Sequence, residues 1–257
     1  MKKLIIIMTS IVLLIAMSQN ISAEAGDARS WYIKRNGTRR PALDKDQEII
    51  YDYNGYYIDK RLTDEGRERK IYLTFDLGYS NENVTKILDA LERHGIPAAF
   101  FILDNIILKN TDLVTRMINS GHLICNHSKN HKDLSFASSE EIRYDLHALE
   151  SIMIEKTGHE LSKYFRFPEG RYSTSSLNAV SKLGYKSIFW SFAYEDWDNA
   201  RQMPVDKAFK KIINNTHNGA VMLFHPTSKT NADIFDRLII EWKSMGYEFG
   251  TLDELTA

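Results

Sequence analysis

A short run of β-prone residues, Ile71-Tyr72-Leu73-Thr74-Phe75, is followed directly by Asp76-Leu77-Gly78-Tyr79. Apolar and β-branched residues that end at a glycine predict a buried strand. In a β/α protein, the carboxyl end of a strand is where side chains can face a ligand while the strand holds them rigid. Asp76 stands at that point and is a candidate catalytic residue, although an aspartate there also commonly caps the next turn or helix.

Strands and helices alternate along the chain after residue 70. Strands are predicted at 71–75, 96–103, 122–126, 164–166, 186–190, 220–224 and 247–251, and helices at 82–94, 112–119, 138–156, 174–183, 205–214 and 233–245. Ser138 and Glu141 form a capping-box pattern at the start of one helix, and Gly158 closes it. This order predicts an α/β fold whose parallel sheet closes into a distorted, seven-stranded (β/α) barrel.

The N-terminal part of the chain differs from this pattern. Residues 1–25 predict a secretory signal peptide, because Lys2 and Lys3 precede an apolar run that ends near Ala23-Glu24-Ala25. The run is shorter than the roughly 20 residues of a spanning helix, although an uncleaved anchor is an alternative. We therefore expect a protein secreted across the cytoplasmic membrane, without stable membrane insertion after cleavage. Residues 26–70 predict an arm packed on a barrel domain at 71–257.

Composition limits the partners. The 257 residues are 43% hydrophobic with a formal net charge of -1, which predicts one domain with a large core and argues against a nucleic-acid partner. The single cysteine, Cys125, excludes an internal disulfide and is expected in a buried strand. A monomer is expected. The basic cluster Lys34, Arg35, Arg39 and Arg40 predicts a solvated face, with contact to an anionic polymer as the alternative.

Polar side chains follow five of the predicted strands. They are Asp76 after the first, His127 and His131 after the third, Arg166 at the end of the fourth, Asp196-Trp197 after the fifth and His225 after the sixth. Because parallel strands end at one rim, we expect these side chains to converge there.

The residue types indicate a chemistry. His127 and His131 are four residues apart, so one tight turn can direct both imidazoles at a cation, and a nearby carboxylate and an open position would suit a divalent metal that activates water. Asp76 is a candidate general base and His225 a candidate general acid. These parts predict hydrolysis of an acyl bond without a serine or cysteine nucleophile.

Two further residues are candidate supports for this pair. Arg166 can keep the Asp76 carboxylate ionised, and Asp196 can orient His225 and favour its charged form.

At this point the sequence resembles the polysaccharide deacetylases of carbohydrate esterase family four, over residues 71–252. The family pattern T-F-D-D-G is similar to Thr74–Gly78, H-S/T-x-x-H to His127–His131, R-x-P-x-G to Arg166–Gly170, D-W to Asp196-Trp197 and L-x-H to Leu223–His225. The resemblance implies a distorted (β/α) barrel and metal-dependent N-deacetylation of an N-acetyl sugar polymer.

The resemblance also implies roles for single residues. Asp76 would be the base, His225 the acid, and His127 and His131 the metal ligands, with Arg166 and Asp196 as supporting partners. The implied cofactor is a divalent metal ion, Zn²⁺ in first place, with Mg²⁺, Mn²⁺ and Co²⁺ as alternatives.

One position departs from the family pattern. The second aspartate of T-F-D-D-G, normally a metal ligand, is Leu77, and leucine cannot coordinate a cation. Three protein ligands become two, which implies a weakly held ion, a ligand from elsewhere, or a glycan-binding protein without activity.

A residue other than aspartate at this position, followed by Gly78-Tyr79, resembles the sequence of one group within the family, the delta-lactam-biosynthetic de-N-acetylases of endospore formers. Trp31–Arg35, Phe189–Ala193 and Asp196-Trp197 resemble that group too. This resemblance implies action in the cell wall or spore cortex on peptidoglycan strands, at N-acetylmuramic acid whose peptide has been removed. The freed amine would then close as muramic δ-lactam.

Three residues are predicted to contact the substrate: Tyr79, Trp197 and Arg171. The Arg171 guanidinium is the candidate partner of the lactyl carboxylate of muramic acid, because a planar guanidinium binds a carboxylate through two hydrogen bonds. Two alternatives stay open, a general deacetylase of N-acetylglucosamine polymers and a non-catalytic glycan-binding protein.

Overall fold

The computed structural model describes residues 27–257 of the protein. The predicted signal peptide, residues 1–25, lies outside the described residues.

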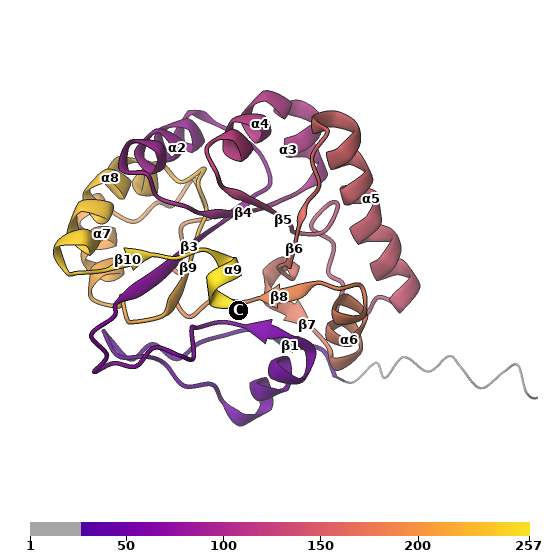
Figure 1. Ribbon diagram of the computed structural model, residues 1–257, viewed down its shortest axis with the longest axis horizontal. Coiled ribbons are helices and arrows are strands. Elements are labelled where there is room, and N and C mark those ends of the chain that lie inside the picture. Colours follow the sequence, from indigo (N-terminus) through magenta and orange to yellow (C-terminus); the bar gives the residue numbers. More distant parts are fainter. Residues whose placement is uncertain (1–26) are drawn as a thin grey trace, which may run out of the picture.

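Seven strands occupy the predicted positions. They are β3 (Lys70–Leu77), β4 (Ala99–Ile102), β5 (Leu123–Asn126), β6 (Ser162–Phe165), β8 (Lys186–Ile188), β9 (Ala220–Phe224) and β10 (Glu248–Phe249). They are parallel in the order β10-β3-β4-β5-β6-β8, with β9 also paired to β3, and the sheet curls round on itself (Figure 1). An eighth strand, β2 (Gly55–Tyr56), comes from the N-terminal arm and pairs with β8. The predicted distorted (β/α) barrel is confirmed.

The barrel is closed by irregular backbone. Beyond the end of β8, Phe192 forms a parallel bridge with Met222 of β9, and Ile58 of the arm forms an antiparallel bridge with Ala220. A loop and the arm therefore complete the ring between β8 and β9.

The strand β3 presents different residues to its two sides, because side chains alternate along a strand. Leu73, Phe75 and Leu77 lie in the core layer between the sheet and the helices. Tyr72 lies inside the barrel in the same cluster as Cys125, whose predicted burial is confirmed. Asp76 shares the inner side of the strand with Tyr72, and this alternation directs its carboxylate inward.

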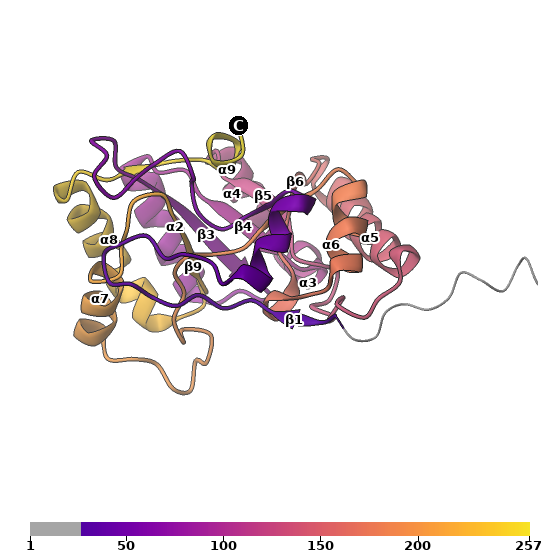
Figure 2. The same ribbon diagram turned by 90° about the horizontal axis from the view of Figure 1, so that it is seen from below.

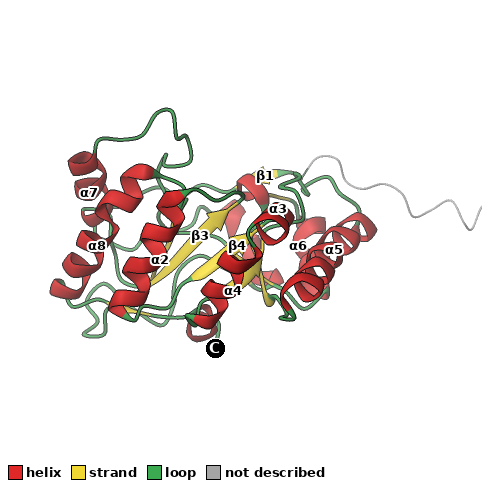
Figure 3. Cartoon of the chain, turned by 90° about the horizontal axis from the view of Figure 1, so that it is seen from above, coloured by secondary structure: helices red, strands yellow, loops and turns green. Residues whose placement is uncertain are grey.

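Helices cover the outside of the sheet (Figure 3). They are α2 (Glu82–His94), α3 (Asp104–Lys109), α4 (Thr111–Asn119), α5 (Ser139–Thr157), α6 (Thr174–Lys182), α7 (Val205–Ile213), α8 (Lys229–Ser244) and the short α9 (Leu252–Leu255). The capping box of Ser138 and Glu141 is present at the start of α5, and Gly158 ends that helix in the left-handed region. Within residues 27–257, none of the helices has the length and apolar composition to span a membrane.

Two helical predictions need correction. The helix α3 was not predicted, because six residues are too few to show a helical period. The helix α8 begins at Lys229 rather than at residue 233, because Ser228 caps it by accepting a hydrogen bond from the Asn231 amide. Polar Thr230 and Asn231 are buried in its first turn, so the apolar pattern starts later than the helix itself.

The N-terminal arm is more regular than its sequence indicated. Its strand β1 (Arg29–Ser30) pairs antiparallel with β7 (Arg171–Tyr172), and its 3-10 helix η1 spans Lys45–Tyr53. Trp31 is buried against Phe189, with ring centroids 4.5 Å apart, and its indole N–H donates to the Trp190 carbonyl. The arm packs as part of the barrel wall (Figure 2).

Candidate active site

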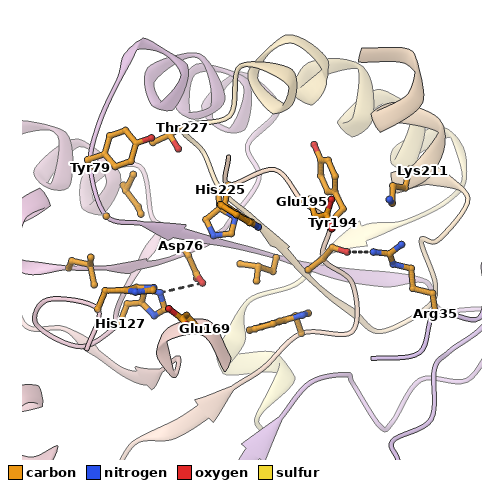
Figure 4. Close-up of a pocket in the computed structure, with 18 residues that line it drawn as sticks. Arg35, Asp76, Tyr79, His127, Glu169, Tyr194, Glu195, Lys211, His225 and Thr227 are labelled. Atoms are coloured by element: carbon orange, nitrogen blue, oxygen red, sulfur yellow. Dashed lines mark hydrogen bonds and ion pairs between the residues drawn. The ribbon is translucent and has the colours of Figure 1, made fainter. Parts of the chain in front are cut away.

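A cavity of about 910 Å³ lies at the carboxyl ends of the strands. Of the residues predicted from the sequence, six line it: Asp76, Tyr79, His127, His131, Trp197 and His225 (Figure 4). The loop between β8 and α7, which carries Asp196 and Trp197, projects from the body of the molecule beside α7 (Figure 2). The strand ends therefore bring most of the predicted side chains to one place.

Asp76 is held by the fully buried Arg166. The guanidinium donates to Asp76 Oδ1 at 2.8 Å, to the Thr74 hydroxyl at 2.9 Å and to the Ile188 carbonyl at 3.0 Å. Burial alone would raise the pKa of Asp76, but the charge of Arg166 in first place, together with that of His225, outweighs it and lowers the pKa below its usual value. Asp76 is therefore an ionised carboxylate with Oδ1 occupied and Oδ2 turned towards the cavity.

His127 and His131 lie on a tight loop after β5. Ser128 adopts a left-handed backbone (φ 68), and its hydroxyl accepts a hydrogen bond from the His131 amide at 2.9 Å, which brings the two imidazole centroids to 5.0 Å. His127 Nδ1 lies 2.8 Å from the Arg166 carbonyl, so it donates there, while Nε2 lies 3.5 Å from Asp76 Oδ2. Burial lowers the pKa of His127 to about 4, so its Nε2 lone pair is available at neutral pH.

His225 is oriented by Asp196, a buried residue of the β8–α7 loop. Asp196 accepts from His225 Nδ1 at 2.7 Å, from the His225 amide at 2.8 Å and from the Asn231 side chain at 2.6 Å. Burial would lower the pKa of His225, but the charge and hydrogen bond of Asp196 outweigh it, so the pKa is raised above its usual value. The ring is thus a proton donor whose Nε2 is free to face the cavity.

Asn231 supports the site but was not among the residues predicted from the sequence. It lies in the first turn of α8, accepts a hydrogen bond from the Tyr194 hydroxyl and donates to both Asp196 and the His225 carbonyl. The late predicted start of α8 concealed it, since only a helix beginning at Lys229 places Asn231 beside the β9 end.

The residue that follows Asp76 packs among apolar side chains. Leu77 is fully buried, packs in the outer core layer and is also one of the residues that line the cavity beside Asp76. Among residues 27–257, no cluster of three histidine, cysteine, aspartate or glutamate side chains is placed to hold a metal ion. His127 and His131 suit a divalent cation as a pair, but the described part of the chain does not supply a complete ligand set beside them.

The three predicted substrate contacts have different surroundings. Tyr79 and Trp197 are exposed aromatic side chains of the cavity wall, with exposed fractions of 52% and 59%. Arg171 does not line the cavity, and its Nε lies 2.7 Å from Asp133 Oδ2 in an ion pair.

The cavity also contains charged residues that were not among the predicted site residues. Glu169 belongs to the 3-10 turn η2 (Pro168–Gly170), has a left-handed backbone (φ 56) and lies next to His127 (Figure 4). Arg35 of the arm and Lys211 of α7 line the other side of the cavity. The sequence places Arg35 in a basic cluster predicted to be a solvated face or, as the alternative, a contact for an anionic polymer, and tertiary folding brings it to this wall.

Residues 63–188 match the polysaccharide deacetylase family. Over 227 residues the chain is 37% identical to an uncharacterised 30.6 kDa protein of Geobacillus stearothermophilus, covering 88% of this chain and 84% of that protein. Over 257 residues it is 32% identical to the peptidoglycan-N-acetylmuramic acid deacetylase PdaA of Bacillus subtilis, covering 99% of this chain and 96% of that protein.

Solved structures show the same similarity. The structure of Bacillus subtilis PdaA, a family 4 carbohydrate esterase, superposes with a TM-score of 0.83 at 32% identity, covering 91% of this chain and 98% of that one. A family 4 carbohydrate esterase from Bacillus anthracis superposes with a TM-score of 0.73 at 31% identity, with the same shares covered.

Proposed function

The chain belongs to the polysaccharide deacetylase family, carbohydrate esterase family four, and from this premise we propose that it hydrolyses the N-acetyl group of N-acetylmuramic acid in peptidoglycan. The observation that carries the proposal is the meeting of two supported side chains in one cavity. Asp76 is held ionised by Arg166, and His225 is oriented by Asp196, whose charge favours its protonated form. The full-length similarity to a muramic acid deacetylase supports the choice of sugar.

The two side chains divide the proton transfers between them. Water attacks the acetyl carbonyl carbon while Asp76 Oδ2, the oxygen left free by Arg166, accepts its proton. The tetrahedral intermediate collapses as His225 Nε2–H protonates the amine, and acetate leaves. The raised pKa of His225 favours the protonated form of this acid. Tyr79 and Trp197 offer exposed rings to the sugar faces of the polymer.

The family implies a divalent metal, with Zn²⁺ as the first candidate and Mg²⁺, Mn²⁺ or Co²⁺ as alternatives. Such an ion polarises a carbonyl and lowers the pKa of bound water. His127 Nε2 and the His131 ring would hold it, weakly, because Leu77 occupies the place of the third ligand.

The finer parts of the proposal concern the substrate. We propose that the muramic residues are peptide-free, as in the spore cortex, and that the freed amine proceeds to the δ-lactam. The enzyme would then act outside the cytoplasmic membrane, in the cell wall or cortex space.

Mass spectrometry of peptide-free glycan strands incubated with the purified protein tests the proposal. Loss of one acetyl group per modified muramic residue is expected. Equal or faster deacetylation of N-acetylglucosamine oligomers would instead favour a general deacetylase. Binding of strands with no acetate released at any metal concentration would favour the non-catalytic alternative, which Leu77 supports.

A further inference from the structure

Two cations face the cavity without an acidic partner. Among residues 27–257, neither Arg35 nor Lys211 forms an ion pair, although Glu195 lines the same cavity. Arg35 donates to the Ala193 carbonyl at 2.9 Å, and its guanidinium lies 5.9 Å from the Phe192 ring centroid. One of the five N–H groups of Arg35 thus donates to the Ala193 carbonyl, and the others are available to bind an anion.

Their place in the cavity is separate from the reacting groups. Figure 4 shows Arg35 and Lys211 together on one side, Asp76 and His127 on the other, and His225 between them. The two cations come from the arm and from α7, so the basic wall exists only once these segments have packed together.

The arginine predicted from the sequence to bind a carboxylate has other surroundings. Arg171 is ion-paired with Asp133 and lies outside the cavity lining. A guanidinium already paired with a carboxylate gains little from a second one, whereas an unpaired guanidinium gains a charge-assisted hydrogen bond. The structure therefore favours Arg35 over Arg171.

Resting on the proposed function, we propose that Arg35, assisted by Lys211, binds the lactyl carboxylate of a neighbouring muramic residue in the same strand. The reacting residue cannot supply this carboxylate, because its own lactyl group is close enough to its nitrogen to form a lactam and must lie beside Asp76 and His225. Muramic residues alternate with glucosamine residues, so a strand along the cavity presents a second carboxylate beyond His225. The basic wall thus selects strands whose neighbouring peptide has also been removed.

The test compares Arg35→Gln and Lys211→Gln with Arg39→Gln, a matched control on an exposed arginine of the same arm that does not line the cavity. Binding by calorimetry and deacetylation are measured on peptide-free strands and on the same strands with their carboxylates converted to neutral amides. Arg35→Gln should weaken binding and lower kcat/KM about 10- to 100-fold on the acidic strands. It should change neither on the neutral strands or on a fragment with a single muramic residue. Lys211→Gln should show the same pattern, and Arg39→Gln should behave like wild type.

The outcomes separate this inference from the proposed function. If no strand is deacetylated but Arg35→Gln still loses the charge-dependent binding, the inference stands and the proposed function fails. If acetate is released and Arg35→Gln matches wild type on acidic strands, the inference is overturned and the function stands. A loss confined to Arg171→Gln, or an equal Arg35→Gln loss on the single-muramic fragment, also overturns it.

Discussion

The surroundings of a single residue, Asp76, set both the basicity of its carboxylate and the orientation of its side chain. Arg166 binds Oδ1 and lowers the pKa, so the carboxylate stays ionised but is a weak base. A weak base contributes less to proton transfer, so the site depends on positioning and on the acid, His225. The inward side of β3 supplies that positioning.

Asp76→Asn and His225→Gln should each lower kcat by about 100-fold or more, because each removes one proton-transfer partner. Asp76→Asn also leaves Arg166 buried without its carboxylate, which costs about 3–5 kcal/mol of stability, so folding is checked by circular dichroism and thermal melting. Asp198→Asn, on a partly exposed aspartate of the β8–α7 loop that does not line the cavity, is the control and should keep its activity. Near-wild-type turnover by a folded Asp76→Asn protein would remove Asp76 from the role of base.

The second residue-scale prediction concerns pH. An acid works while protonated, so activity persists below the folded pKa of His225 and is lost as pH rises through it. Asp196 raises the pKa of His225 above its usual value, whereas burial lowers it. Without the Asp196 charge the effect of burial dominates, so Asp196→Asn should shift the alkaline limb of the kcat profile to lower pH. Asn231→Ala leaves the Asp196 charge in place and should shift the limb less. An unchanged limb in Asp196→Asn would mean that another group is the acid.

At the scale of elements, the candidate metal site depends on a strand end and a loop. The left-handed Ser128 brings His127 and His131 together, while Leu77, at the end of β3, packs in the apolar layer at the edge of the cavity and offers no ligand atom. Two ligands on one loop hold an ion less firmly than three ligands from two elements.

Leu77→Asp should therefore tighten Zn²⁺ binding and also destabilise the metal-free protein, on the order of 3 kcal/mol, because a carboxylate replaces a buried leucine. Added Zn²⁺ should raise the melting temperature of Leu77→Asp more than that of wild type, since an ion that binds the folded state stabilises it. Calorimetry and melting curves with and without Zn²⁺ measure both effects, and His127→Ala should bind no ion tightly. Tight wild-type binding that Leu77→Asp leaves unaltered would show that another group is the third ligand.

At the scale of the whole molecule, the arm is part of the barrel. It supplies β2 to the sheet, Ile58 to the closure between β8 and β9, and Arg35 to the cavity. Trp31 anchors it between Phe189 and Trp190, above the left-handed Gly170 (φ 64), where an added Cβ would lie 2.8 Å from the Trp31 Cβ.

Trp31→Ala should lower the free energy of unfolding by about 3–5 kcal/mol, the usual cost of removing a buried tryptophan. Since η2 and the β8–α7 loop pack against the arm, activity should fall as well. Tyr144→Ala, which truncates an exposed aromatic on α5, should change stability by no more than about 0.5 kcal/mol. Urea unfolding measures both variants, and equal stability of Trp31→Ala and wild type would show that the arm is dispensable to the fold.

Much of the fold could be predicted because its determinants are local. The strand β3, the Ser138 capping box and the seven-strand order follow from apolar periodicity and turn residues close together in sequence. The helix α3 and the start of α8 could not be predicted. The helix α3 is too short to show a helical period of apolar residues, and α8 begins with buried polar residues.

The sequence by itself determined the barrel, the rim where the polar strand ends meet, and the departure from the family pattern at Leu77, because strand alternation and motif spacing are properties of neighbouring residues. Tertiary structure alone decided which side chains became partners. Arg166 reaches Asp76 across 90 positions, Asn231 reaches Asp196 across 35, and Arg171 pairs with Asp133 while Arg35 faces the cavity. Such pairs depend on the packing of segments far apart in the chain, and no local pattern records that packing.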